Sequence, residues 1–139
     1  MKTSVLASAI MTSPVLTVDA DERLARLSQI FSEKQLHHLL VVDEDRFVGV
    51  ISDRDFYKSI GPRAQSQIAN SVEAAALNKR AHQVMSRHPI CVREHQSVED
   101  VMDLLIAHQI SCVPVVNSQN FPIGIISWRD VIKLLREND

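Results

Sequence analysis

Hydrophobic positions along the chain follow the same order twice. Apolar residues recur at three- and four-residue spacing over residues 24–31, and the same stripe returns over residues 98–105, which is 98 − 24 = 74 residues further on. Such spacing predicts two amphipathic helices whose apolar faces lie in the core. The expected core positions are Leu24, Leu27, Ile30, Phe31, Val98, Val101, Leu104 and Leu105.

Short β-prone runs surround each predicted helix. Residues 15–18 and 90–92 follow prolines, and residues 39–42 and 113–116 are too short and too β-branched for helices. Polar turns at 43–45 and 117–120 then lead into a second apolar run, so each repeat should contain a hairpin. A closing amphipathic helix follows, opened by Asp55 in one copy and by Asp130 in the other. Each repeat is therefore predicted as strand, helix, strand, strand, helix.

The boundaries of the repeats follow from these patterns. Asp19 with Glu22, and Ser97 with Asp100, have the spacing of helix starts. We predict a first repeat over residues 1–60, a helical linker over 61–83, and a second repeat over 84–139. About 55 residues cannot easily bury two helices and a sheet alone, so the repeats should form one module.

The motif Gly-x-x-Ser-x-x-Asp ends the hairpin and opens the closing helix in both repeats. Gly49 to Asp55 reads GVISDRD, and Gly124 to Asp130 reads GIISWRD; these two glycines are among only three in the chain. A strand-to-helix corner of this kind brings together a hydroxyl, a carboxylate and free helix N-terminal amides. These groups suit the binding of a sugar and a phosphate.

Composition narrows the classes of function. The chain has 139 residues, a formal net charge of -2 and a pI of about 6.3, so no overall positive field favours nucleic acid or membrane surfaces. No apolar run approaches the length of a membrane span. Cys91 and Cys112 lie in apolar runs, which suits buried thiols in a reducing compartment, so we expect a cytoplasmic protein. The histidines lack metal spacing and no nucleophile has an evident base, so we expect no metal, no cofactor and no enzyme activity.

With both copies of the motif identified, the chain resembles a tandem pair of CBS (cystathionine β-synthase) domains, also called a Bateman module. The resemblance covers residues 10–135 and includes the Met-Thr/Ser openings at Met11 and Met85 and the Val-Pro-Val-Val run that starts at Val113. It implies an α/β (α+β) fold of two βαββα repeats, packed sheet to sheet with pseudo-two-fold symmetry. It also implies a homodimer that senses an adenine nucleotide (AMP, ADP or ATP) and regulates a separate, unknown protein; here we expect the module alone, without an attached domain.

The resemblance also assigns ligand-binding residues to two clefts between the repeats. In each cleft the Ser-x-x-Asp corner of one repeat would meet the opening strand and the segment before the second strand of the other repeat. Asp130 and Asp55 would accept hydrogen bonds from ribose hydroxyls, and Ser127 and Ser52 would face phosphate. One cleft would contain Leu16, Thr17, Leu36, His37, His38, Ser127, Arg129 and Asp130. The other would contain Ser52, Arg54, Asp55, Cys91, Val92, Ile110, Ser111 and Cys112.

Simpler roles exist for the same residues. Asp55 and Asp130 could cap their helices without any ligand, and the serines could do the same. Because His38 is matched by Cys112 in the second repeat, the first cleft is the better phosphate site. Trp128 stands where the first repeat has Asp53 and is a candidate for a dimer contact or for stacking on adenine. Two alternative functions stay open, a ligand-free dimerisation scaffold and a sensor of S-adenosylmethionine.

Overall fold

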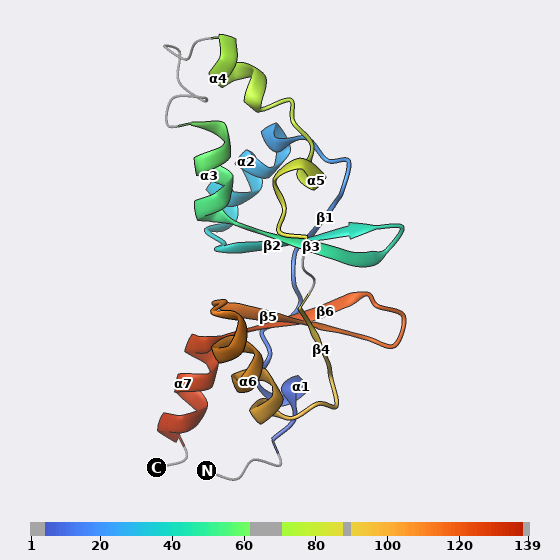
Figure 1. Cartoon of the computed structure of the whole chain (residues 1–139), viewed down its shortest axis with the longest axis vertical. Helices are drawn as coiled ribbons and strands as arrows, with labels where there is room; N and C mark the ends of the chain where they lie inside the picture. The colour runs from blue at the N-terminus through green and yellow to red at the C-terminus, as the bar shows by residue number, and fades with distance from the viewer. Residues whose placement is uncertain (1–4, 62–70, 88–89, 138–139) are drawn as a thin grey trace. The chain divides into compact units, whose positions relative to one another are not determined.

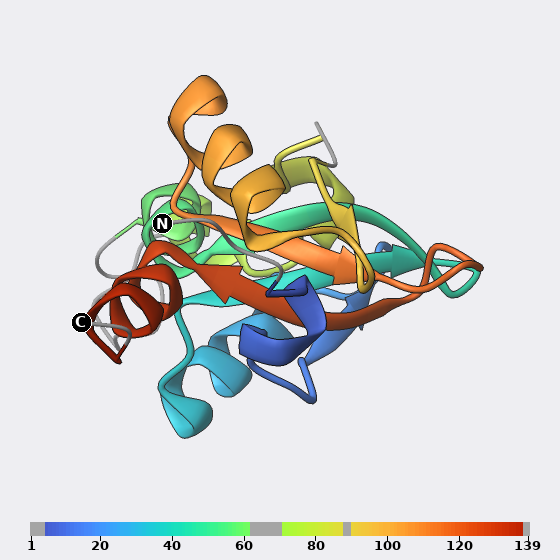
Figure 2. The same cartoon turned by 90° about the horizontal axis from the view of Figure 1, so that it is seen from below.

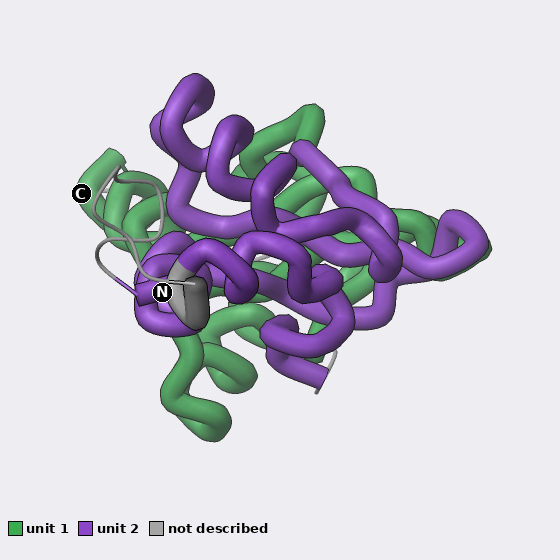
Figure 3. Tube along the Cα trace, turned by 90° about the horizontal axis from the view of Figure 1, so that it is seen from above, with its two compact units in different colours: residues 1–15, 90–139 green, residues 16–89 purple. Residues whose placement is uncertain are grey.

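The computed structural model describes residues 5–61, 71–87 and 90–137, with side chains from residue 74 onward in the second of these ranges. The chain forms two compact units (Figure 3). Unit 1 consists of Met1–Val15 together with Ile90–Asp139, and unit 2 consists of Leu16–Pro89. Each unit therefore has its own sheet and its own set of helices.

Unit 2 contains a three-stranded sheet in the order β1-β2-β3, with helices against one face (Figure 1). Strand β1 runs parallel to β2, and β2 and β3 form an antiparallel hairpin. The elements are β1 (Thr17–Asp19), α2 (Leu24–Lys34), β2 (His38–Asp43), β3 (Arg46–Ser52), α3 (Asp53–Ile60), α4 (Ser71–Ala76) and α5 (Ala81–Val84). The predicted order of strand, helix, strand, strand, helix is confirmed for the first repeat.

Unit 1 repeats this arrangement with the sheet order β4-β5-β6. Strand β4 is parallel to β5, β5 is antiparallel to β6, and the helices are seen in front of this sheet in the view from below (Figure 2). The elements are α1 (Ala7–Ile10), β4 (Val92–Arg93), α6 (Val98–His108), β5 (Cys112–Val116), β6 (Pro122–Ser127) and α7 (Trp128–Glu137). The mixed α/β class and the two βαββα repeats are therefore confirmed.

The predicted apolar stripes form the centres of the two cores. Leu24 and Leu27 are fully buried in unit 2, as are Val98 and Val101 in unit 1. Phe31 is buried as well, and the centroid of its ring lies 5.1 Å from the ring centroid of Phe56 on α3. Ile30, Leu104 and Leu105 are partly buried and pack against the same clusters. Helical spacing therefore identified the inward faces of α2 and α6.

The two predicted helix starts have different outcomes. Ser97 caps α6 as expected, because its hydroxyl accepts a hydrogen bond from Asp100 N (3.1 Å) and the Asp100 carboxylate accepts one from Ser97 N (3.4 Å). The prediction for Asp19 and Glu22 was wrong, since α2 begins at Leu24 and has Arg23 as its N-cap.

Backbone carbonyls of the linker accept the first amide protons of α2 instead. Leu24 N donates to Lys79 O (2.9 Å), and Ala25 N donates to Leu77 O (3.0 Å). A side-chain cap is not needed where carbonyls from a distant segment already accept these amide protons. Of the helical linker predicted over residues 61–83, α4 and α5 are seen, and residues 62–70 lie outside the described part of the chain.

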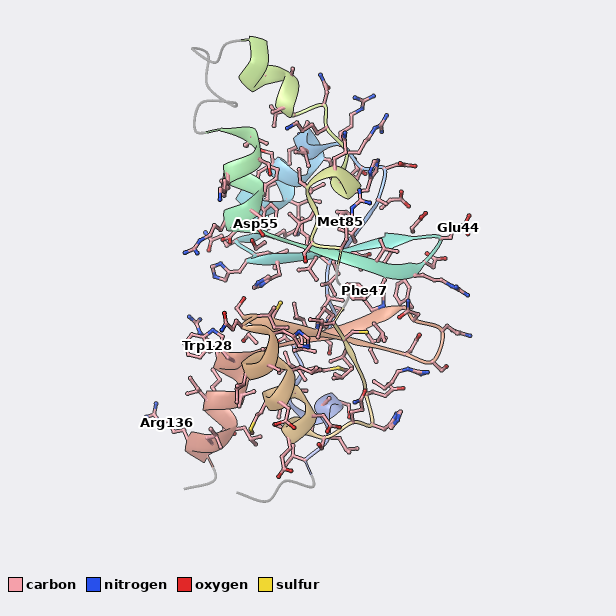
Figure 4. All side chains as sticks on the ribbon, viewed as in Figure 1. Glu44, Phe47, Asp55, Met85, Trp128 and Arg136 are labelled. Carbon is pink, nitrogen blue, oxygen red and sulfur yellow. The ribbon has the colours of Figure 1, made fainter. Side chains whose placement is uncertain are left out.

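The segment that opens each repeat packs in the compact unit of the other repeat. Met85 and Ser86 lie against Gly49 on β3, where Ser86 N donates to Val50 O (2.9 Å) and Val50 N donates to Ser86 O (3.3 Å); Figure 4 labels Met85 at this position. Met11 lies against Gly124 on β6 in the same way. The repeats seen in the sequence and the compact units seen in space therefore have different boundaries.

Candidate functional site

The corner between β3 and α3, here called the α3 corner, consists of residues 52–55 together with His37 and His38. Ser52 ends β3 in an extended conformation and caps α3, because its hydroxyl accepts a hydrogen bond from Asp55 N at 3.0 Å. His38 pairs with Ser52 across the β2–β3 hairpin, so both histidines lie at the same end of the sheet. The hairpin register therefore brings together side chains that are 14 to 18 residues apart in the sequence.

The first amides of α3 all have partners inside the protein. Asp53 N donates to His37 O (2.9 Å), and Arg54 N donates to the Asp53 carboxylate at Oδ1 (2.7 Å). Asp55 N donates to the Ser52 hydroxyl, as described above. The other oxygen of Asp53, Oδ2, lies 3.1 Å from His37 Nδ1. Groups of the α3 corner itself therefore accept the first three amide protons of the helix. Asp53 has contacts on both of its carboxylate oxygens.

The two histidines differ in their surroundings. The His37 side chain is 74% exposed and pairs with Asp53. His38 is half-buried; burial lowers the pKa of its imidazole below 6.5, and the nearby Asp53 carboxylate acts in the opposite direction. Loss of water around a cation disfavours the charged form, so neutral His38 is the favoured state in this environment. A phosphate close to the ring would favour the protonated form again, because a nearby anion raises the pKa of an imidazole.

The matching corner between β6 and α7, here called the α7 corner, consists of residues 127–130 together with Ser111 and Cys112. Asp130 Oδ2 accepts hydrogen bonds from Ser127 N (2.9 Å) and from the Ser127 hydroxyl (3.2 Å), and Asp130 N lies 3.3 Å from that hydroxyl. Within the described residues no hydrogen bond reaches Asp130 Oδ1. The carboxylate is thus held in place through one oxygen while the other is available.

The α7 corner differs from the α3 corner at the second amide of the helix. Trp128 N donates to Ser111 O (3.2 Å), just as Asp53 N donates to His37 O. Trp128 has no carboxylate to accept the next amide, and no hydrogen bond from Arg129 N is seen in the part of the chain that the structure describes. The Trp128 side chain is 57% exposed and is labelled at the start of α7 in Figure 4.

Of the two thiols of unit 1, that of Cys112 is buried and that of Cys91 is half-buried. Burial raises the pKa of the Cys112 thiol to about 12, and it also raises the pKa of the half-buried Cys91 thiol, where Arg93 has the opposite effect. Both cysteines are free. A neutral thiol at Cys112 offers a phosphate much weaker contacts than the histidine at the equivalent position in unit 2.

The remaining predicted residues lie in or next to β1 and β4, before the two hairpins, and on α3. Thr17 begins β1, and the carbonyl of Leu16 accepts a hydrogen bond from Leu40 N at 3.3 Å. Leu36 packs partly against the core of unit 2, Ile110 does the same in unit 1, and Val92 is buried in β4. Arg54 is exposed on α3. Each unit thus contains one complete set of opening strand, pre-hairpin segment and Ser-x-x-Asp corner, whereas the predicted pairing of each corner with the other repeat stays a prediction.

A surface hollow of about 320 Å³ adjoins part of this set in unit 2. It lies between β1 and α2, and both Leu16 and Thr17 line it. The other lining residues, which the sequence did not single out, are Val18, Asp19, Glu22, Arg26, Ile30, Glu33 and Lys34. An exposed strand edge with room beside it suits a flat, hydrogen-bonding group.

Sequence reasoning missed Asp53 as a member of the site. Counting back from the turn at Asp43 to Asp45 places Ile51 opposite His38, because the sequence does not show the irregularity between Val41 and Val42 that brings Ser52 there, so the contact between His37 and Asp53 had no signal in the sequence. Among the described residues no group of three or more His, Cys, Asp or Glu is arranged to hold a metal ion. The helices in the described ranges include none that is long and apolar enough to cross a membrane.

Two repeats of one strand-helix-hairpin-helix unit, each with a Ser-x-x-Asp corner at the start of its last helix, define a tandem domain pair. The family model described as "CBS domain" matches residues 7–61 and again residues 81–137. The chain therefore belongs to the CBS domain family and contains a tandem pair.

Curated relatives are larger than this chain. Inosine-5'-monophosphate dehydrogenase from Methanocaldococcus jannaschii is 28% identical over 128 residues, which cover 91% of this chain and 23% of the dehydrogenase. The next two relatives, uncharacterised proteins from the same organism, are covered to 44% and 36%. The chain thus spans less than half the length of the first curated relatives that it matches.

Solved structures of CBS domain pairs have the same fold over nearly the whole chain. The CBS domain pair of protein MJ0100, in complex with 5'-methylthioadenosine and S-adenosyl-L-methionine, has a TM-score of 0.76 and 25% identity, with 97% of this chain and 98% of that chain covered. CBSX2 in complex with AMP has a TM-score of 0.77 and 23% identity, with 96% and 98% covered. These likenesses support the tandem CBS architecture.

Proposed function

We propose that this chain is a regulatory module that binds an adenosine-containing metabolite, foremost AMP, ADP or ATP, and thereby modulates a separate protein. The observation that carries the proposal is the pair of Ser-x-x-Asp corners, each of which presents a carboxylate beside a helix start. A carboxylate that accepts hydrogen bonds from two neighbouring hydroxyls is a strong, charge-assisted partner for a ribose. We assign no catalytic activity and no resident cofactor, and the cytoplasmic location stays a prediction.

Asp130 is the better prepared of the two carboxylates. Its Oδ2 is fixed by Ser127, and its Oδ1 can accept a ribose hydroxyl without loss of the helix cap. Asp55 is exposed on the first turn of α3, and its carboxylate is not held by a matching contact within the described residues. A ligand at Asp55 would therefore have to order this side chain, which costs conformational entropy.

The relative with bound ligands supports the adenosine part of the proposal. Both 5'-methylthioadenosine and S-adenosyl-L-methionine, the ligands of the MJ0100 domain pair, contain an adenosine group. Neither has a phosphate, so a sensor of S-adenosylmethionine remains the principal alternative to a nucleotide sensor. The two differ in the charge that they present beyond the ribose.

Thermal unfolding in the presence of ATP, ADP, AMP and S-adenosylmethionine tests the proposal. A ligand at about 100 times its Kd stabilises the folded chain by roughly 2.7 kcal/mol, which raises the melting temperature. Calorimetry should then show that Asp130→Ala loses more affinity than Asp55→Ala, by about tenfold or more, because a charge-assisted hydrogen bond is worth about 1.5–3 kcal/mol. No stabilisation by any of the four compounds would contradict the proposal.

A ligand-free dimerisation scaffold is the second candidate, and one observation favours it. Trp128, Ile132 and Leu135 follow each other along α7 at helical spacing, and they are 57%, 48% and 40% exposed. Exposed apolar side chains on one helix face are typical of a protein–protein contact. We propose that this face forms a homodimer contact in either case, and light scattering that shows a monomer at tens of micromolar would contradict it.

A further inference from the structure

The two corners share a backbone plan but differ in charge at one position. Asp53 and Trp128 are equivalent, since each is the first residue of its helix and each donates its amide proton to the residue before the hairpin. At the α3 corner the Asp53 carboxylate accepts the next amide, Arg54 N, at 2.7 Å. At the α7 corner Trp128 leaves that acceptor out. One side chain therefore decides whether a carboxylate accepts the second amide proton of the helix.

We propose that Asp53 is a specificity-determining residue that excludes phosphate groups from the α3 corner, so that this corner accepts phosphate-free adenosine compounds. The inference rests on the proposed function, because it names the ligand class for one of the two corners. The same corner would take adenosine itself, a thioether such as 5'-methylthioadenosine, or a sulfonium such as S-adenosylmethionine.

Hydrogen bonds account for the first part of the exclusion. A phosphate at a helix start needs free amide protons, which it accepts on its oxygens. At the α3 corner, His37 O, Asp53 Oδ1 and the Ser52 hydroxyl already accept the amide protons of Asp53, Arg54 and Asp55. A phosphate would have to displace the Asp53 carboxylate from the short contact with Arg54 N.

Charge accounts for the second part. Asp53 and Asp55 both belong to the first turn of α3 and place two carboxylates at the end of the helix that would otherwise attract an anion. His37, which could offset this charge, is in contact with Asp53 already. Arg54 is the remaining cation of the first turn, and its side chain is exposed. A sulfonium or a neutral thioether meets no such repulsion.

Trp128 shows that the fold does not require a carboxylate at this position. Helix α7 starts from an equivalent residue without one, and its backbone follows the same contact to the pre-hairpin segment. Asp53 can therefore be replaced without removal of a contact that both corners share. The Ser52 cap of α3 also stays in place in such a variant.

Pyrophosphate titration of the full chain, followed through backbone amide resonances, tests the exclusion without any adenosine ligand. The titration is run at pH 8, well above the ordinary pKa of a histidine side chain. The Arg54 amide should not shift in the wild type, should shift in Asp53→Ala, and should shift less in Asp53→Asn, whose amide oxygen can still accept the Arg54 proton. Asp45→Asn removes the same charge at the far end of β3 and should behave like the wild type.

Calorimetry with adenosine and AMP completes the test. Asp53→Ala should bind AMP at the α3 corner about tenfold more tightly than the wild type does, while its affinity for adenosine stays within about twofold. An Arg54 amide that shifts equally in the wild type and in Asp53→Ala, or in neither, would overturn the role of Asp53. Wild-type protein that binds neither adenosine nor AMP would contradict the proposed function, and the pyrophosphate result would still decide the role of Asp53.

Discussion

Replacement of the motif glycines by alanine should destabilise the protein through the methionines that open the opposite repeats. A Cβ on Gly49 would lie 2.6 Å from Met85 Sδ and 2.7 Å from the carbonyl oxygen of Ser86. The three heavy atoms nearest to a Cβ on Gly124 would all belong to the Met11 side chain, with Cγ at 2.8 Å and Cβ at 3.0 Å. Carbon atoms do not approach other heavy atoms this closely, so the neighbouring segment must move.

The cost should differ between the two sites because the obstacles differ. Met11 can rotate part of its side chain away, whereas the carbonyl of Ser86 can move only if the paired hydrogen bonds between Ser86 and Val50 are disturbed. Overpacking typically costs about 1–3 kcal/mol, so we expect about 1–2 kcal/mol for Gly124→Ala and about 2–3 kcal/mol for Gly49→Ala. Urea denaturation with midpoint and slope measured for each variant provides the comparison.

Double-mutant cycles test the assigned contacts directly. In a Met11→Ala background the obstacle at Gly124 is largely gone, so Gly124→Ala should cost less than about 0.5 kcal/mol, with a coupling of about 1 kcal/mol or more. In a Met85→Ala background the Ser86 carbonyl remains 2.7 Å from the new Cβ, so Gly49→Ala should keep at least about 1 kcal/mol of its cost. Equal costs of Gly124→Ala with and without Met11 would refute the reasoning.

Three further perturbations follow from single contacts. Ser97→Ala should cost about 1 kcal/mol because it removes the side-chain cap of α6, whereas Arg23→Ala at the equivalent position of α2 should cost less, since backbone carbonyls cap that helix; equal costs in urea denaturation would contradict this. Burial lowers the pKa of His38, so the unfolded chain binds the proton more readily, and the melting temperature should fall as the pH drops below about 6.5; His38→Gln should flatten this slope. Trp128→Ala should weaken the dimer at least tenfold by light scattering or ultracentrifugation, and an unchanged dimerisation constant would remove Trp128 from the contact.

Local chemistry made the elements predictable from the sequence. Residues at helical spacing on α2 and α6 form the cores, and the polar turns at Asp43 and Asn117 mark the two hairpins. These features depend on side chains a few positions apart, so a short window contains the whole signal. The cap of Ser97 was found for the same reason, since its partner Asp100 is three residues away.

Contacts between distant segments could not be predicted in this way. The start of α2 is completed by carbonyls of residues 77 and 79, more than fifty positions later, and nothing near Arg23 signals them. The pair of His37 and Asp53 depends on the register of the hairpin, which is shifted by an irregularity between Val41 and Val42.

Because the segment that opens each repeat packs in the compact unit of the other repeat, we can predict which fragments of the chain fold. A fragment cut at the sequence repeat, residues 1–61, lacks Met85 and Ser86, which cover Gly49, and lacks the carbonyls that cap α2. A fragment of residues 16–89 contains both, together with the complete apolar cluster of unit 2. We therefore expect residues 16–89 to unfold cooperatively, at a lower temperature than the full chain because the fragment is small. Residues 1–61 should show no cooperative transition by circular dichroism, and a cooperative transition in that fragment alone would mean that the exchanged segment is dispensable for folding.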